Sequence, residues 1–193
     1  MKVRSSLFFC VFTAFLLFPH HTLVALPAQV LIIRHGNKLT VNPGEHLSLL
    51  GRERAAALTP YLMETKELLT YGSPVAIYAK GVSTGDPSLR PIETVSELAE
   101  KLKLPLIKNY TVETFQKMVE EIKNNPTYSG KMVLICWDHY HIPGIAEAFG
   151  VTNAPKQWSN EVFDRVWMIN FNKEGVESFQ NLPQRLMYGD SST

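Results

Sequence analysis

Charged and titratable residues stand directly after apolar segments at three places in the sequence. Arg34 and His35 end the run QVLIIRH, and Arg90 follows a polar loop after the run PVAIYA. His139 comes after the run MVLICW, behind Asp138. Arginines present forked donors to phosphate oxygens, and a neutral imidazole is a competent nucleophile toward phosphorus. Brought together in one pocket, these residues suit the chemistry of a phosphate group.

The apolar runs predict the strands that bring these residues together. Four unbroken runs are typical of buried strands: residues 29–34, 74–79, 131–137 and 163–171. Helical spacing predicts helices at residues 47–69, 88–102 and 112–123, with N-caps at Ser48 and Ser88 and a kink or break at Pro60. This alternation predicts an α/β three-layer sandwich, a mostly parallel sheet with helices on both faces. Ligand sites in such sheets lie beyond the carboxyl ends of the strands.

The N-terminal residues predict a secretory signal peptide that is not part of the fold. Lys2 and Arg4 precede an apolar run at residues 7–18, and small residues follow at Ala25 and Ala28. The run is shorter than the roughly 20 residues that span a bilayer, so cleavage is favoured over an uncleaved membrane anchor. We expect residues 1–25 to be removed and residues 26–193 to form one secreted or periplasmic domain, without stable membrane insertion.

The composition is that of a folded, nearly neutral protein. The chain is 45% hydrophobic and 19% charged, which excludes a disordered class. A net charge of +1, without long runs of like charge, argues against nucleic acid as a partner. Cys136 is the only cysteine beyond the predicted leader and lies in an apolar run, so we expect a buried, inert thiol. Trp167 is expected in the core for the same reason.

Four segments, in this order along the chain, resemble the histidine phosphatase superfamily, also called phosphoglycerate-mutase-like. LIIRHG resembles the family's Arg-His-Gly signature, and LSLLGRERAAAL resembles its Leu-Thr-x-x-Gly-x-x-Gln-Ala helix. SLRPIETVSELAEKL resembles its Ser-x-x-x-Arg-x-x-x-Thr-Ala helix, with Arg90, Glu93 and Thr94 in register. MVLICWDH resembles the strand that delivers the second catalytic histidine. The resemblance covers residues 29–171 and says little about the substrate.

The resemblance implies a phosphohistidine mechanism without a metal or an organic cofactor. His35 would attack the phosphorus, and Arg34, Arg90 and His139 would surround the phosphoryl oxygens. Water would then hydrolyse the phosphohistidine, so the expected partner is a phosphorylated small molecule or a phosphoprotein. His139 and His141 could instead bind zinc, but no His-Glu-x-x-His helix or Asp-rich set accompanies them.

The sequence departs from the family pattern beside both histidines. Asn37 stands where many members carry Glu, and Tyr140 follows the second histidine where others have Gly or Asp. The general acid therefore stays open between Glu113, the first candidate, and Asp138. Asn37, Lys38, Asp138 and Tyr140 are expected to contact the substrate.

Three functions fit these residues. The leading prediction is an exported phosphatase acting on a phosphomonoester through His35. A non-catalytic member of the same fold that binds a phosphorylated ligand is the alternative, motivated by Asn37, Tyr140 and the unsettled acid. A phosphoglycerate mutase ranks below both, because a glycolytic role conflicts with an export signal and the chain is short for the extra segments of a mutase.

Overall fold

Six strands form one mixed sheet in the computed structural model, which describes residues 26–191. The strands are β1 (Gln29–Arg34), β2 (Ala76–Ala79), β3 (Leu106–Ile107), β4 (Met132–Trp137), β5 (Arg165–Asn172) and β6 (Gly175–Pro183). Their order across the sheet is β3-β2-β4-β1-β5-β6. The first four strands in this order are parallel to one another. β5 pairs antiparallel with β1, and β6 pairs antiparallel with β5. The predicted signal peptide, residues 1–25, lies outside the described residues.

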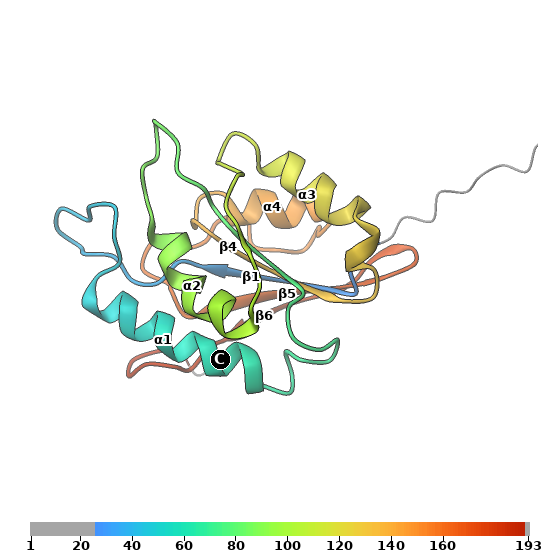
Figure 1. The fold of residues 1–193 in the computed structure, drawn as a ribbon, viewed down its shortest axis with the longest axis horizontal. Coiled ribbons are helices and arrows are strands. Elements are labelled where there is room, and N and C mark those ends of the chain that lie inside the picture. Colours follow the sequence, from blue (N-terminus) through green and yellow to red (C-terminus); the bar gives the residue numbers. More distant parts are fainter. Residues whose placement is uncertain (1–25, 192–193) are drawn as a thin grey trace, which may run out of the picture.

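Four helices cover the two faces of the sheet (Figure 1). They are α1 (Leu49–Glu64), α2 (Arg90–Leu102), α3 (Phe115–Asn124) and α4 (Ile142–Phe149). One core cluster joins α1 and α2 to the sheet, and a second joins α3 and α4 to the opposite face. The predicted α/β sandwich is therefore confirmed. Three elements, α4, β3 and β6, were absent from the sequence prediction.

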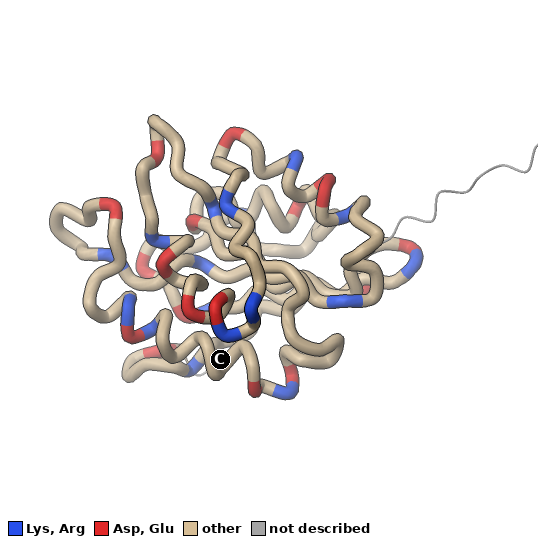
Figure 2. The backbone as a smooth tube through the Cα atoms, viewed as in Figure 1, with Lys and Arg blue, Asp and Glu red and all other residues tan. Residues whose placement is uncertain are grey.

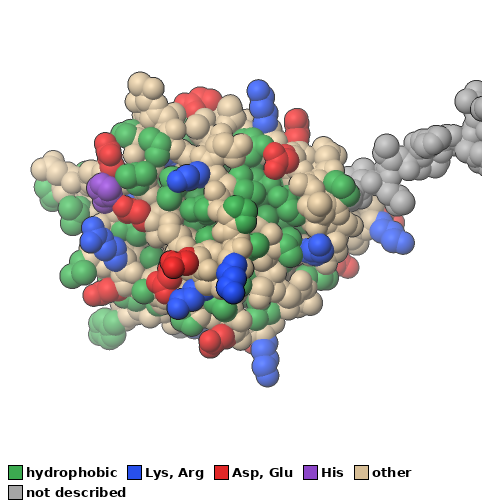
Figure 3. All heavy atoms as spheres, viewed as in Figure 1, with side chains coloured by type: hydrophobic (Ala, Val, Ile, Leu, Met, Phe, Trp, Pro, Cys, Tyr) green, Lys and Arg blue, Asp and Glu red, His purple; other side chains and the backbone are tan. Residues whose placement is uncertain are grey.

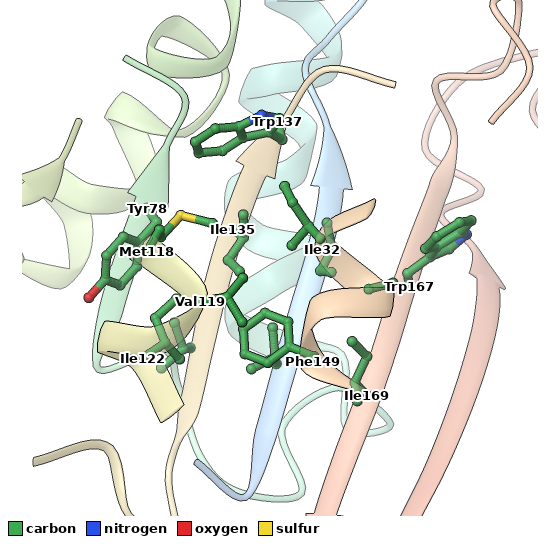
Figure 4. Close-up of a cluster of buried hydrophobic side chains, with 14 of the residues drawn as sticks. Ile32, Tyr78, Met118, Val119, Ile122, Ile135, Trp137, Phe149, Trp167 and Ile169 are labelled. Atoms are coloured by element: carbon green, nitrogen blue, oxygen red, sulfur yellow. The ribbon is translucent and has the colours of Figure 1, made fainter. Parts of the chain in front are cut away.

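β1 explains why a buried strand has an unbroken apolar sequence. Val30 and Ile32 pack into the cluster beneath α3 and α4, while Leu31 and Ile33 pack into the cluster beneath α1 and α2. Successive side chains of a strand point to opposite faces, so a strand covered on both faces needs apolar residues throughout. Figure 4 shows the cluster on the α3 and α4 side, where Met118, Val119 and Ile122 of α3 and Phe149 of α4 meet side chains of the strands.

Cys136 and Trp167 lie where the sequence predicts them. Cys136 is a free, fully buried thiol in β4, and burial raises its pKa, so it is inert as a nucleophile. Trp167 is buried in β5. Basic and acidic residues are interspersed along the chain in Figure 2, with no extended stretch of one sign in that view.

The helix starts confirm one predicted cap and correct another. The Ser48 side chain accepts a hydrogen bond from the Gly51 N–H, as an N-cap does. Ser88 does not cap α2, because Leu89 occupies the N-cap position and provides no side-chain bond. Of the kink or break expected at Pro60, the break is wrong. α1 continues through Pro60 to Glu64, and buried leucines on either side of the proline hold it against the sheet.

Candidate active site

The parallel strands bring the predicted residues to one edge of the sheet. In the strand register, Arg34 lies beside Trp137 and Ala79 lies beside Cys136, so β1, β2 and β4 end together. The His35 N–H donates to the Trp137 carbonyl over 3.0 Å and extends the pairing by one residue. Arg90 is the first residue of α2 and begins its helix at the same edge.

His35 is held in one tautomer by the backbone carbonyl of the next residue, Gly36. Its Nδ1 lies 2.7 Å from the carbonyl oxygen of Gly36. A carbonyl can only accept, so Nδ1 carries the hydrogen and Nε2 keeps a free lone pair. Burial lowers the pKa of His35 to about 3, and the positive charges of Arg34 and Arg90 act in the same direction. At neutral pH His35 is therefore an uncharged imidazole with a lone pair on Nε2.

One nitrogen of the Arg34 guanidinium binds the loop before β5, and the other two have no hydrogen-bond partner among residues 26–191. Nη1 donates to the carbonyl oxygens of Ser159, Asn160 and Val162, over 3.3, 2.8 and 2.7 Å. The guanidinium carbon lies 3.6 Å from the centre of the Phe163 ring, in cation–π contact. Nε and Nη2 are buried without a partner. Burial lowers the pKa of Arg34 to about 10, so it stays charged at neutral pH, with the N–H groups of two nitrogens available to a ligand.

Thr94 connects Arg90 to the loop of the nucleophile. Its hydroxyl donates to the Arg90 carbonyl over 2.7 Å and accepts the Gly36 N–H over 2.8 Å. The Arg90 side chain donates to the Gly44 carbonyl over 2.5 Å, and its Nε has no partner. Burial lowers the pKa of Arg90, as expected for a guanidinium partly withdrawn from water. The distance from Gly36 to Arg90 is thus set by one buried threonine.

His139 and Asp138 follow β4. Together with Arg34, His35 and Arg90 they form the polar cluster at this edge of the sheet, which we call the cluster. His139 is buried, neither ring nitrogen has a partner, and burial with the Arg34 charge lowers its pKa to about 4. The Tyr140 ring lies 3.9 Å from the His139 ring and is mostly exposed. Asp138 Oδ1 accepts from the N–H groups of Tyr140 and His141 and from the ring Nδ1 of His141, while Oδ2 is buried without a partner.

The remaining residues that the sequence predicts for the site differ in where they lie. Lys38 lies near the cluster, since burial and the charges of Arg34 and Arg90 lower its pKa. The Asn37 side chain points to α1 instead, where Oδ1 accepts from Nε of Arg54 over 2.9 Å. Glu113 lies at the surface, close enough to Asp86 and His141 for their charges to act on its pKa.

Glu113 is fully exposed and accepts from Thr111 over 2.5 Å, and this hydrogen bond lowers its pKa. A general acid instead needs a raised pKa.

Two glycines allow α1 to approach the loop that follows His35. A Cβ on Gly51 would lie 2.1 Å from the Asn37 carbonyl oxygen, and one on Gly36 would lie 2.7 Å from the Gly51 carbonyl oxygen. Both distances are far below van der Waals contact with a rigid backbone group. The glycines of the segments LIIRHG and LSLLGRERAAAL therefore belong to one contact.

The sequence analysis missed the loop before β5 and the C-terminal segment. Glu161 lies close enough to Arg34 for its charge to raise the pKa of that guanidinium. Arg54 forms a buried ion pair with Asp190 over 2.6 Å. No local pattern marks these residues, because their partners are distant in sequence.

Within residues 26–191, no group of three or more His, Cys, Asp or Glu side chains is placed to hold a metal ion. No helix in that span is both long and apolar enough to cross a membrane.

Comparison with known proteins identifies the fold. The sequence matches no protein-family model, and no curated protein matches it. Solved structures do match. The protein histidine phosphatase SixA, complexed with tungstate, has a TM-score of 0.54 and 15% identity, over 81% of this chain and 97% of that chain. Phosphoglycerate mutase from Bacillus anthracis has a TM-score of 0.54 and 15% identity, over 82% of this chain and 93% of that chain.

A third match is the mycobacterial glucosyl-3-phosphoglycerate phosphatase with inorganic phosphate. Its TM-score is 0.51 and its identity 12%, over 80% of this chain and 95% of that chain. All three are histidine phosphatase superfamily members. The chain thus has the fold of the histidine phosphatase superfamily, the phosphoglycerate-mutase-like α/β fold that the sequence resemblance implied.

Proposed function

We propose that this protein is an exported phosphatase that hydrolyses a phosphomonoester through a phosphohistidine on His35. The observation that carries the proposal is the state of His35: buried, uncharged, and held by Gly36 with the Nε2 lone pair free. Two guanidinium groups with unpartnered N–H groups stand beside it. Export rests on the N-terminal sequence alone.

The first step transfers the phosphoryl group to the enzyme. The Nε2 lone pair of His35 forms a bond to phosphorus while the bond from phosphorus to the leaving oxygen breaks. Negative charge stays on the three phosphoryl oxygens in a loose transition state. Arg34 and Arg90 are fixed and charged before the substrate arrives, so they stabilise that charge without reorganising. Binding of the phosphate dianion raises the pKa of His139 and favours its donating form.

The second step returns the enzyme to its starting state. A water oxygen bonds to phosphorus, the nitrogen–phosphorus bond breaks, and the imidazole recovers its lone pair. The carboxylate that protonated the leaving oxygen takes the proton from water. The products are inorganic phosphate and an alcohol, and the phosphorylated substrate is a small molecule or a phosphoprotein.

Asp138 is the proposed general acid. Its Oδ2 is buried, has no partner and lies in the residue next to His139, whereas Glu113 is fully exposed and its pKa is lowered. Glu161 is the competitor that the structure adds. Asp138→Asn should slow poor leaving groups more than good ones across a series of phosphate esters, because only poor leaving groups need the proton. If Glu161→Gln shows this selectivity and Asp138→Asn does not, the assignment is wrong.

His35→Ala tests the reaction itself. Rapid-quench labelling with a radioactive phosphate ester, stopped at alkaline pH because phosphohistidine is acid-labile, should give a label on the wild-type chain that turns over. His35→Ala should carry no label and hydrolyse no ester. The exposed His46 provides a matched control, since His46→Ala should keep both. Ligand binding without any label in the wild type would favour the non-catalytic alternative.

A further inference from the structure

A cleft beside His35 is lined by none of the residues proposed to surround the phosphate, Arg34, Arg90 and His139. Its volume is about 400 Å³, and it lies between the loop after β1, the start of α1, the loop before β5 and the C-terminal segment. We call it the Leu50 cleft; its walls include Asn37, Leu50, Glu161, Phe163, Met187 and Tyr188. The Phe163 ring centre is 6.0 Å from that of His35, so the cleft adjoins the nucleophile.

The charged and amide groups deepest in the wall are already engaged with each other. Arg54 donates to Asn37, to Gln184 and to both carboxylate oxygens of Asp190. The same carboxylate accepts the N–H groups of residues 186 and 187. A sugar or polyol would need donors and acceptors of its own in this wall, and the Arg54 network offers it few.

Apolar side chains at the mouth are instead left to water. Leu50 is 46% exposed and Tyr188 is fully exposed. Other exposed large apolar residues, Leu39, Val41 and Leu49, belong to the same loop and helix start. Figure 3 shows hydrophobic side chains projecting at the end of the molecule that carries this loop. Exposed apolar groups beside a reactive centre are typical of a binding surface.

The charges favour one kind of ligand. Arg34, Arg90 and Lys38 suit the anionic phosphate, while Glu161 in the cleft wall repels any second anionic group. A neutral, apolar group next to the phosphate matches both ends. The Phe163 and Tyr188 rings provide aromatic faces and edges for such a group.

We propose that the Leu50 cleft binds the leaving group of the substrate and that the substrate class is aryl phosphomonoesters. This rests on the proposed phosphatase function and adds its specificity. The competing location is a groove of about 590 Å³ beyond His139, which is bordered by apolar side chains and by Lys156. The groove lacks an acidic residue in its wall, so Lys156 would suit a leaving group that carries a second negative charge.

The test compares two adjacent leucines. Leu50 lines the cleft, whereas Leu49 is more exposed and is not part of its wall. Leu50→Asn should raise KM for 2-naphthyl phosphate about fivefold, the loss expected when roughly half of a leucine side chain no longer contacts an apolar ligand. KM for glycerol 3-phosphate and inhibition by inorganic phosphate should not change. Leu49→Asn should behave as wild type with both substrates.

Two results would overturn the assignment. Equal KM values for Leu49→Asn and Leu50→Asn with 2-naphthyl phosphate would remove the leaving group from the cleft. A rise in KM confined to Lys156→Ala would place it in the groove beyond His139. Calorimetric binding of 2-naphthyl phosphonate, which has no cleavable ester, gives the same comparison without turnover. It separates failure of the cleft from failure of the proposed phosphatase.

Discussion

The Arg54–Asp190 ion pair fastens the C-terminal segment to α1 and offers a quantitative test. The two oxygens of Asp190 lie 2.6 and 2.9 Å from the guanidinium nitrogens, and the side chains are 4% and 6% exposed. Asp190→Asn keeps the shape but leaves the Arg54 charge buried without a counter-charge. Breaking a buried pair from one side costs about 3–5 kcal/mol, and the retained amide oxygen places the expected loss near the lower limit, about 3 kcal/mol.

Urea denaturation at pH 7 measures this loss. A loss of this size is a large part of the roughly 5–15 kcal/mol that stabilises an ordinary domain. Glu97→Gln, a carboxylate exposed on α2, should change the free energy of unfolding by less than about 0.5 kcal/mol. Arg54→Gln combined with Asp190→Asn should be more stable than Asp190→Asn alone, because no charge is left buried. A loss below about 1 kcal/mol, or a double variant as unstable as the single one, would refute the reasoning.

The pH dependence of the same pair has a defined sign. Burial raises the pKa of Asp190, but the hydrogen bond from Arg54 and those from two backbone N–H groups outweigh it and leave the pKa below its usual value. A carboxyl whose pKa is lowered by folding stabilises the protein above its unfolded pKa of about 3.9. The difference between wild type and Asp190→Asn should therefore be constant near neutral pH and shrink as the pH falls below about 4.

Two further predictions concern the nucleophile and its loop. Gly51→Ala should destabilise the protein by about 1–3 kcal/mol in urea denaturation, because the added Cβ meets the Asn37 carbonyl oxygen. Gly85→Ala is the control, since Gly85 has open space around it and the substitution should cause no such loss. Equal losses of stability in the two variants would contradict the close approach of Gly51 to Asn37. His35 is held neutral with a pKa of about 3, so the unfolded chain binds more protons below pH 6.5 and the free energy of unfolding should fall as the pH drops from 6.5 toward 3. His35→Gln should show a shallower fall over that window, and an unchanged slope would contradict the lowered pKa.

The central strands and the position of His35 at the end of β1 were predictable because their signals are local. β1 is apolar at every position that both helical layers cover, and the run stops where Arg34 and His35 reach the edge of the sheet. Ser48 is recognisable as a cap because a cap acts on a residue three positions away. Each of these features is decided by neighbours in the sequence.

Other elements were missed because distant contacts decide them. β6 is partly exposed along its length, so its sequence GVESFQNLP lacks an apolar run, and pairing with β5 forms the strand. α4 contains Pro143 and Gly144 and is only eight residues long. Glu161 reaches the cluster because Arg34 binds its loop, whereas Glu113 stays at the surface. The position of a carboxylate relative to a leaving oxygen is a property of the tertiary structure alone.

Chemical labelling of the buried Cys136 thiol can measure how often the structure around the central strand β4 opens. Cys136 is the only cysteine of residues 26–191 and packs in the core cluster beneath α1 and α2, so a reagent reaches it only after this face of the sheet has been uncovered. In a chain that starts at Leu26, the rate of thiol labelling under native conditions therefore follows the opening of the core that covers β4, the strand before His139. Ligands that bind the folded site should slow that labelling in proportion to their occupancy. Phosphate esters can then be screened for binding by the rate of Cys136 labelling, which requires no catalytic turnover.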